Sequence, residues 1–415
     1  MREQLEGSQA IARAVARCRP HVVPAYPITP QTHIVEGLGK LVKAGALEHC
    51  EFITVESEFA AMSAAIGASA AGARSYTATA SQGLLYMAEA LFNAAGLGLP
   101  IVMTVANRAI GAPINIWNDQ SDAMSQRDCG WVQLYAADNQ EAVDLHPVAF
   151  ALAEQISVPV MVCVDGFVLT HAFEPLELPA LEDIDAVLPA YEPRQVLDPD
   201  EPVTIGAMVG PEAYTEVRYL ADQQLRSAQT AFAELAGRYA ARIGRRIAAV
   251  RAPAEAPART VVVTLGSVLG TVEDVAAETE GAVGVVGLTM YRPFPADALR
   301  EAVRGADHVI VLERAFSPGA GAPVTSDVRT ALYGTSTRIS TVVGGLGGRP
   351  VTRSAVREML SAADRDELAE FSFLDLDAGV VERELSRQRS ATRPGPAAAS
   401  VLREVVPAGR GRETS

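Results

Sequence analysis

Three short polar segments near the start of the chain carry groups that can do chemistry. They are Tyr26-Pro27-Ile28-Thr29-Pro30, Glu56-Ser57-Glu58-Phe59-Ala60-Ala61 and Ala106-Asn107-Arg108-Ala109. Each follows an apolar stretch with strand character, and open α/β sheets build their sites at the carboxyl ends of their strands. Together the segments offer one pocket a hydroxyl, a carboxylate and a guanidinium, which suits proton transfer and the binding of an anion.

Glu58 is expected in the first turn of an apolar helix over residues 60–73, which Ser57 is suited to cap. The helix N-terminus favours a charged carboxylate there, while burial opposes the charge. An ordinary acidic residue at a helix start is the alternative interpretation. Glu56 is a second carboxylate in the same segment.

Arg108 ends an apolar strand and lies in a hydrophobic neighbourhood, where an unpaired guanidinium is costly. It therefore needs an anion. One candidate is a substrate carboxylate, which arginine binds in bidentate geometry. The other is a structural salt bridge to Asp119, Asp122 or Asp128, and the residues alone do not separate the two.

The elements that position these groups alternate between strand and helix over residues 1–175, which predicts a doubly wound parallel sheet. Expected strands cover residues 21–28, 51–55, 75–80, 100–106 and 158–164; expected helices cover residues 8–18, 34–44, 60–73, 84–95 and 141–156. Thr79, Ser81 and Gln82 stand where one of these helices opens, beside the pocket. The loop over residues 107–127 is long enough to indicate a function.

Beyond residue 175 a proline-rich connector, 176–257, contains a long helix over residues 212–243. A second α/β pattern follows at 258–380, with strands expected at 260–265, 283–288 and 308–312 and a helix at 271–279. The turn Gly344-Gly345-Leu346-Gly347-Gly348 is a weak phosphate-binding signal, so packing is the favoured role. The tail, 381–415, is expected to be mobile from Thr392 onward.

Composition narrows the class of protein. The 415 residues carry 50 acidic and 35 basic side chains, a net charge of −15, which argues against nucleic-acid or anionic-membrane binding. The four cysteines, Cys18, Cys50, Cys129 and Cys163, form no C-x-x-C pair, so no zinc or iron–sulfur site is expected within the chain. No secretory signal or membrane span is apparent, and we expect a cytoplasmic protein.

In order and spacing, the three segments resemble the aminopyrimidine-binding half of a thiamine diphosphate site, as in the α subunit of pyruvate:ferredoxin (2-oxoacid:acceptor) oxidoreductase. The spacing E-x-x-A-x-x-A-A-x-G, here Glu58, Ala61, Ala64, Ala65 and Gly67, favours Glu58 over Glu56. The resemblance covers about residues 5 to 375. It implies a thiamine pyrimidine-binding domain followed by a second α/β domain similar to the C-terminal domain of transketolase.

The resemblance also implies roles for particular residues. Glu58, Thr29 and Arg108 are expected to be catalytic, with Glu58 exchanging a proton with N1′ of the aminopyrimidine ring. Glu58, Thr29, Ser81 and Gln82 are expected to bind the cofactor, and Arg108, Thr29 and Asn107 the substrate. No metal ligand is expected in this chain. His171 is interpreted as structural rather than catalytic, and Tyr291-Arg292 and Glu313-Arg314 as interface residues.

Such a half-site is inert alone, so the resemblance implies partners. The chain lacks the G-D-G segment that holds the diphosphate through Mg²⁺. A β subunit is expected to supply that site and a [4Fe-4S] cluster, with γ and ferredoxin-like δ subunits completing the enzyme.

The implied reaction converts pyruvate and coenzyme A to acetyl-CoA, CO₂ and reduced ferredoxin. Ser81-Gln82-Gly83-Leu84 and Asn107-Arg108 resemble the pyruvate type rather than the 2-oxoglutarate type. Alternatives are the same chemistry on another 2-oxo acid, a non-catalytic assembly subunit, and an unrelated nucleotide-binding oxidoreductase.

Overall fold

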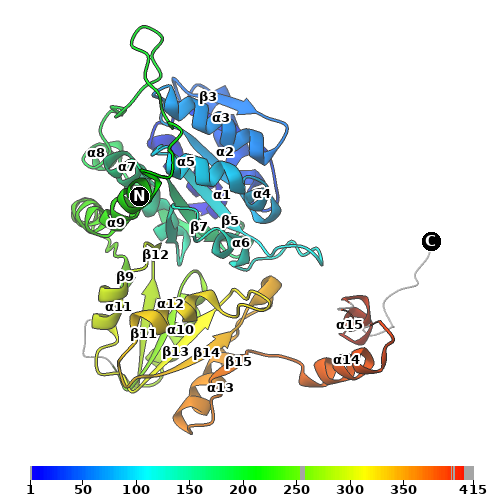
Figure 1. Cartoon of the computed structure of the whole chain (residues 1–415). Helices are drawn as coiled ribbons and strands as arrows, with labels where there is room; N and C mark the ends of the chain where they lie inside the picture. Colours follow the sequence, from blue (N-terminus) through cyan, green and yellow to red (C-terminus); the bar gives the residue numbers. More distant parts are fainter. Residues whose placement is uncertain (1, 253–257, 394, 396–397, 406–415) are drawn as a thin grey trace.

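The computed structural model describes residues 2–252, 258–393, 395 and 398–405. Two α/β units lie one above the other, and a pair of helices near the C-terminus extends to one side (Figure 1). Among the described residues, no helix is both long and apolar enough to cross a bilayer.

The first unit is built on parallel strands. Its elements are β1 (Arg2–Glu6), α1 (Gly7–Arg17), β2 (Val22–Ala25), α2 (Thr32–Lys43), β3 (Glu51–Thr54), α3 (Glu58–Ala70), β4 (Tyr76–Thr79), α4 (Ser81–Tyr86), α5 (Ala88–Gly96), β5 (Val102–Asn107), α6 (Ser121–Ser125), β6 (Val132–Tyr135), α7 (Asn139–Ile156), β7 (Val160–Asp165) and β8 (Phe173–Glu177). The main sheet has the order β12-β6-β7-β5-β4, where β12 (Met290–Arg292) comes from later in the chain, and β2 pairs with β3. A parallel bridge between Val22 and Ser75 joins the pair to β4.

Both faces of this sheet are covered, which explains why β5 and β7 are buried along their whole length. One face packs on α1, α7 and the long helix α9 (Tyr214–Ile243) through a core that includes Ile11, Phe150 and Phe232. The other face packs on α3 and α5, and its core, including Met62 and Trp131, continues into the second unit. The doubly wound arrangement expected from the alternating pattern is confirmed.

The second unit contains a six-stranded sheet with the order β15-β14-β13-β10-β11-β9. Its elements are β9 (Val250–Arg251), β10 (Thr260–Thr264), α10 (Val268–Ala277), β11 (Val283–Leu288), β12 (Met290–Arg292), α11 (Ala296–Ala302), β13 (His308–Glu313), α12 (Pro323–Ala331), β14 (Arg338–Val343), the 3₁₀ turn η1 (Leu346–Gly348), α13 (Arg353–Asp364) and β15 (Phe371–Phe373). Within this six-stranded sheet, all pairings are parallel except that of β9 with β11.

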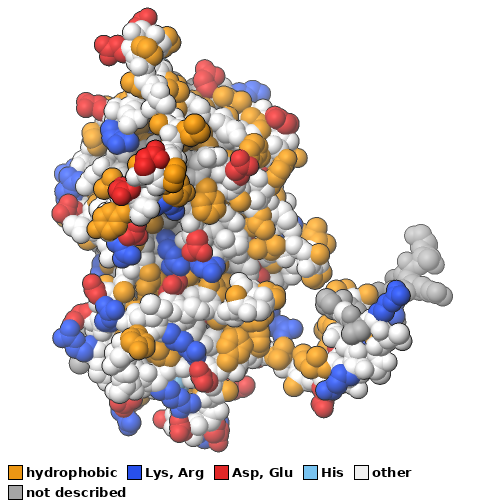
Figure 2. Space-filling model, in the orientation of Figure 1, with side chains coloured by type: hydrophobic (Ala, Val, Ile, Leu, Met, Phe, Trp, Pro, Cys, Tyr) orange, Lys and Arg blue, Asp and Glu red, His pale blue; other side chains and the backbone are white. Residues whose placement is uncertain are grey.

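The two units share a sheet. β12, from the second unit, pairs antiparallel with β6 and so becomes the edge of the first unit's sheet. Basic and acidic side chains gather where the two units meet (Figure 2). Short strands β1, β6, β8 and β12 are absent from the expected pattern, because three to five residues give little periodicity and their antiparallel partners lie far away in sequence.

The connector holds α8 (Leu181–Asp185) and α9, close to the expected long helix. The end of the chain is more regular than expected. α14 (Ala378–Ser390) and α15 (Ala398–Val405) form a hairpin in which Glu404 pairs with Arg383 and Arg387. The rest of the tail expected to be mobile, 406–415, lies outside the described residues.

Candidate active site

The carboxyl ends of β2, β3, β4 and β5 lie at one edge of the first sheet, because these strands run parallel. Thr29 follows β2, Glu58 follows β3, Ser81 and Gln82 follow β4, and Arg108 follows β5. The fold therefore places all the predicted site residues on the same edge.

Asp122 ties two of these strand ends together. Its carboxylate accepts hydrogen bonds from the backbone N–H groups of Ser81 (2.9 Å), Arg108 (3.0 Å) and Ala123 (2.8 Å), and from the side-chain amide of Asn107 (2.8 Å). Burial raises its pKa to about 7, and these donors oppose that shift. Asp122 is therefore an anchor that holds the ends of β4 and β5 in register.

The Arg108 side chain is 7% exposed and donates to two carbonyl oxygens. Its Nη1 binds the Thr29 carbonyl at 2.9 Å and its Nε binds the Asn115 carbonyl at 3.1 Å. Within the described chain the guanidinium has no carboxylate partner, so Asp119, Asp122 and Asp128 do not form the alternative salt bridge. Burial lowers the pKa of Arg108, and the nearby Asp122 carboxylate opposes that shift.

Glu58 is the first residue of α3, where Ser57 caps the helix by accepting from the Ala60 N–H at 3.1 Å. The expected cap is confirmed. Glu58 is 8% exposed, yet its carboxylate has no hydrogen bond or ion pair with any described residue. The carboxylate oxygens keep some access to solvent and are free to accept a hydrogen bond from a ligand.

The Glu58 carboxylate lies against the turn after β4. A Cβ built on Gly83 would stand 2.7 Å from Glu58 Oε1 and 2.6 Å from Thr79 Oγ1. Thr79 Oγ1 is itself buried without a hydrogen-bond partner. Next to these groups Ser81 has a left-handed backbone, with φ of 49°, and its hydroxyl donates to the Ala109 carbonyl at 2.5 Å. The buried, unsatisfied Thr79 hydroxyl and the unpaired Glu58 carboxylate therefore lie together where only a glycine fits.

The loop after Arg108 reaches across to the second unit, as Figure 1 shows beside α6. Asn115 Nδ2 donates to the Gly347 carbonyl at 3.1 Å, and Gly347 N–H donates to Asp119 at 3.1 Å. A Cβ on Gly348 would collide with Trp117. The glycine-rich turn thus packs under this loop, in agreement with the packing role favoured for it.

Asp165, at the end of β7, forms the main polar contact between the units. It pairs with Arg314 at 3.0 Å and accepts from the Ser267 N–H at 2.8 Å and the Ser267 hydroxyl at 2.6 Å. Gln120 adds a hydrogen bond to the other carboxylate oxygen at 3.2 Å. The interface role expected for Arg314 is confirmed, and β12 places Tyr291 and Arg292 at the same boundary.

Among the predicted residues, Thr29 and Arg108 are in direct contact, and Ser81 and Asn107 are joined to Arg108 through Asp122. Gln82 lies beside Gly111, where a Cβ would be 2.6 Å from its Nε2. His171 stacks on Phe167 and on His33, which suits a structural residue. Sequence reasoning missed Asp122 as the anchor, because a buried aspartate in a long loop carries no pattern of its own.

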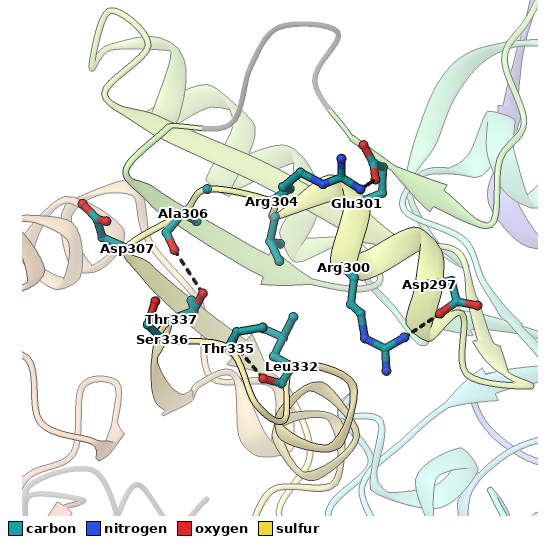
Figure 3. Close-up of a pocket in the computed structure, with 12 residues that line it drawn as sticks. Asp297, Arg300, Glu301, Arg304, Ala306, Asp307, Leu332, Thr335, Ser336 and Thr337 are labelled. Carbon is teal, nitrogen blue, oxygen red and sulfur yellow. Dashed lines mark hydrogen bonds and ion pairs between the residues drawn. The ribbon is translucent and has the colours of Figure 1, made fainter.

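A cavity of about 700 Å³ in the second unit lies between α11 and the end of α12 (Figure 3). Its arginines are paired: Arg300 binds Asp297 at 2.5 Å and Arg304 binds Glu301. None of the predicted site residues lines it.

Comparison with known families gives two matches along the chain. Residues 13–236 match the family described as pyruvate flavodoxin/ferredoxin oxidoreductase, thiamine diphosphate-binding. Residues 258–356 match the pyruvate:ferredoxin oxidoreductase core domain II.

Curated relatives resemble the chain over most of its length. Pyruvate synthase subunit PorA of Methanosarcina barkeri is 43% identical over 392 residues, covering 90% of this chain and 96% of the relative. PorA of Thermotoga maritima is 41% identical over 370 residues, covering 87% of this chain and 94% of the relative. Ketoisovalerate oxidoreductase subunit VorA of Pyrococcus abyssi is 38% identical over 382 residues, covering 90% of this chain and 96% of the relative.

Among solved structures, 2-oxoglutarate:ferredoxin oxidoreductase from Magnetococcus marinus has a similar fold, with a TM-score of 0.67 and 19% sequence identity. The similarity covers 89% of this chain and 65% of that one, so the chain spans about two thirds of its length. At this identity the likeness concerns the fold.

Proposed function

The chain belongs to the pyruvate flavodoxin/ferredoxin oxidoreductase family, and on that premise we propose that it is the α subunit of a pyruvate:ferredoxin oxidoreductase. The reaction is the oxidative decarboxylation of pyruvate with coenzyme A to acetyl-CoA, CO₂ and reduced ferredoxin. The chain is one subunit of a multi-subunit enzyme, as the names of its relatives indicate.

The observation that carries this proposal is the Glu58 carboxylate, which lies at the start of α3 in a residue that is 8% exposed and has no hydrogen bond or ion pair with any described residue. Beside it lie the unsatisfied Thr79 hydroxyl and Gly83, whose missing side chain leaves room for close approach. This donor and acceptor set fits the aminopyrimidine half of thiamine diphosphate. When bound, that cofactor supplies the carbanion-stabilising centre on which 2-oxo acid decarboxylation depends.

In this assignment Glu58 holds a proton at its carboxylate and exchanges it with the ring nitrogen that faces it. Glu58 is the first residue of α3 and is 8% exposed, so a hydrogen bond between its carboxylate and the cofactor is largely shielded from solvent. Ser81 and Gln82, at the start of α4, line the same turn, and we propose both as cofactor contacts.

Arg108 is proposed to bind the substrate carboxylate. Its guanidinium is oriented by the Thr29 and Asn115 carbonyls and forms no ion pair with a described residue, so it is available for a charge-assisted hydrogen bond. Thr29 accepts from this guanidinium through its carbonyl, and Asn107 is joined to the Arg108 backbone N–H through Asp122; we propose both as further substrate contacts. The loop between Arg108 and Gln120 lies beside this edge and is tied to the second unit through Asn115 and Asp119.

The remaining partners are also proposals. We propose a β subunit that holds Mg²⁺, the diphosphate and a [4Fe-4S] cluster, together with γ and ferredoxin-like δ subunits. Large apolar side chains exposed near the half-site support a docking surface there: Ile114 is 80% exposed, Tyr86 61% and Trp117 52%. A cytoplasmic location rests on the four free cysteines, all buried.

The test is viologen reduction by this chain co-expressed with its β partner, with pyruvate and coenzyme A supplied. We expect Glu58→Gln to lower the rate roughly 100-fold or more while bound thiamine diphosphate is retained. Glu56→Gln is the matched control, because Glu56 is exposed and two residues away. Wild-type activity in Glu58→Gln would overturn the assignment.

A second substrate class is favoured by one finding, the 38% identity to ketoisovalerate oxidoreductase subunit VorA. Turnover on pyruvate, 2-oxobutyrate, 2-oxoisovalerate and 2-oxoglutarate separates the classes. A higher kcat/KM for 2-oxoisovalerate would transfer the assignment to branched substrates, and a preference for 2-oxoglutarate would contradict both.

A further inference from the structure

A second cavity, of about 850 Å³, lies on the first unit away from the candidate active site. His21, His49 and Arg74 line it, and they come just before β2, β3 and β4. The residues of the candidate site follow the opposite ends of the same strands. Because these strands are parallel, the two sites lie at opposite edges of the sheet.

The lining of this cavity is basic, in a chain whose net charge is −15. Four arginines and two histidines face one carboxylate, that of Glu48; the basic residues are Arg13, Arg17, Arg19, His21, His49 and Arg74. Cations gathered in a concave surface focus the electrostatic potential and attract anions.

Three of the arginines already have carboxylate partners. Arg74 binds Glu154 at 2.5 Å, Arg19 binds Asp185 at 2.6 Å and Arg13 binds Glu3 at 2.8 Å; each partner lies outside the lining. These pairs fix the arginines in place. They also mean that an anion in the cavity has to be recognised mainly by the remaining cations.

Arg17 is the exception. It ends α1, lines the cavity and forms no ion pair with any described residue. Its Nη1 is buried without a hydrogen bond, and burial lowers its pKa. Arg17 therefore lines the cavity without an ion pair of its own, and the carboxylate of Glu3, which pairs with Arg13, favours its charge. His21 lies in the same positive electrostatic potential, since its pKa is lowered first by burial and then by the charges of Arg74 and His49.

The rest of the wall is apolar and aromatic. Leu41, Leu47 and Leu181 line the cavity together with Tyr191, and the Arg74 guanidinium carbon lies 5.8 Å from the Tyr191 ring centroid. Such a wall suits a ligand with a flat or hydrophobic part beside its charged group.

The cavity of Figure 3 shows that arginines alone do not make such a site. Its volume is similar, about 700 Å³, but the arginines labelled there are each bound to a carboxylate of the same helix or its end. No aromatic side chain lines it. It therefore serves as an internal control for the basic cavity.

We propose that the basic cavity binds a small organic phosphate, with its phosphate at Arg17 and its apolar or aromatic part against Tyr191 and Leu47. A phosphate carries up to two negative charges and several acceptor oxygens, so it can satisfy more than one clustered cation at once. The site is separate from the proposed catalytic half-site and does not depend on it.

The experiment measures binding of phenyl phosphate and AMP to the purified complex by isothermal titration calorimetry, with inorganic phosphate and benzoate as comparators. We expect the organic phosphates to bind more tightly than both comparators. Arg17→Gln is expected to weaken their binding at least 10-fold, with the KM for pyruvate unchanged. Arg304→Gln, in the cavity of Figure 3, is expected to leave binding as in the wild type.

Two further variants keep the test decisive. Arg17→Lys retains the charge and is expected to bind between wild type and Arg17→Gln, which covers the case in which Arg17→Gln folds poorly. Tyr191→Ala is expected to weaken phenyl phosphate but not inorganic phosphate. The proposal is overturned if neither organic phosphate binds, if Arg17 variants bind as the wild type does, or if inorganic phosphate binds as tightly as phenyl phosphate.

Discussion

At the scale of single residues, the candidate site is defined by side chains that lack a partner within the chain. The Thr79 hydroxyl is buried without a hydrogen bond beside the unpaired Glu58 carboxylate, and the Arg108 guanidinium is held by carbonyl oxygens rather than by a carboxylate. Each of these arrangements costs stability unless a ligand completes it. The residues are therefore better explained by binding than by folding.

Gly83→Ala tests the close approach at Glu58. The added Cβ would stand 2.7 Å from Glu58 Oε1, so the carboxylate has to move and activity should fall roughly 10- to 100-fold. Gly67→Ala, on α3, is the matched control because a Cβ there meets nothing within 4 Å. It should keep full activity and stabilise the fold by up to about 1 kcal/mol. Equal activity in the two variants would argue against a placed Glu58.

Arg108→Lys tests the substrate contact. Lysine keeps the charge but loses the planar fork and the bonds to two carbonyl oxygens. We expect kcat/KM for pyruvate to fall roughly 10- to 100-fold, mainly through KM, because a charge-assisted hydrogen bond contributes about 1.5–3 kcal/mol. Steady-state viologen assays measure both constants. An unchanged KM would assign Arg108 to packing alone.

At the scale of elements, α7 is attached to the sheet by a buried histidine. His146 Nδ1–H donates to the Ala142 carbonyl at 2.6 Å, and its Nε2 lies 2.7 Å from the Thr104 hydroxyl on β5. Tyr76 on β4 donates to that hydroxyl at 2.8 Å. The helix and two strands are therefore joined by a continuous series of buried hydrogen bonds, in which a charged His146 is disfavoured by burial.

The buried His146 makes the stability of the fold depend on pH. Burial lowers the pKa of His146 to about 4, below the value of about 6.5 for an exposed histidine. Below pH 6.5 the unfolded chain takes up a proton that the folded one refuses, so stability falls as the pH falls toward 4. Between pH 7.5 and 5 the loss is about 2 kcal/mol.

Urea unfolding of the wild type and of His146→Gln at these two pH values measures this loss. The variant should lose about 2 kcal/mol less than the wild type over the same interval, whatever its stability at pH 7.5. Equal losses in the two proteins would show that His146 is not the group responsible.

The sequence predicted those elements whose signal is local. α3 with its Ser57 cap, the buried strand β5 and the long α9 all appear close to the expected residues. The positions of Thr29, Glu58 and Arg108 at one sheet edge also follow from strand order. The role of Asp122, the pairing of β12 with β6 and the contact of Asp165 with Arg314 depend on residues distant in sequence, which no periodicity reveals.

At the scale of the whole molecule, the C-terminal hairpin stands apart from both units (Figure 1). Its ion pairs are internal, between Glu404 and two arginines of α14, and hydrophobic side chains such as Leu385 and Leu402 are about half exposed. The body of the molecule is packed without it.

Removal of residues after Asp375 should therefore leave the body intact. We expect the melting temperature of the shortened chain to differ from that of the full chain by less than about 2 °C, measured by calorimetry. A loss of more than about 5 °C would mean that the hairpin contributes to the packed core.

The strand shared by the two units has a consequence for biosynthesis. The first sheet has an open edge at β6 until the segment containing β12 has been synthesised, well after the rest of that sheet has left the ribosome. An unpaired edge invites association with other chains. The nascent protein therefore passes through a stage at which its first half is compact but its sheet is unfinished, and separate expression of the first half should give an aggregating product.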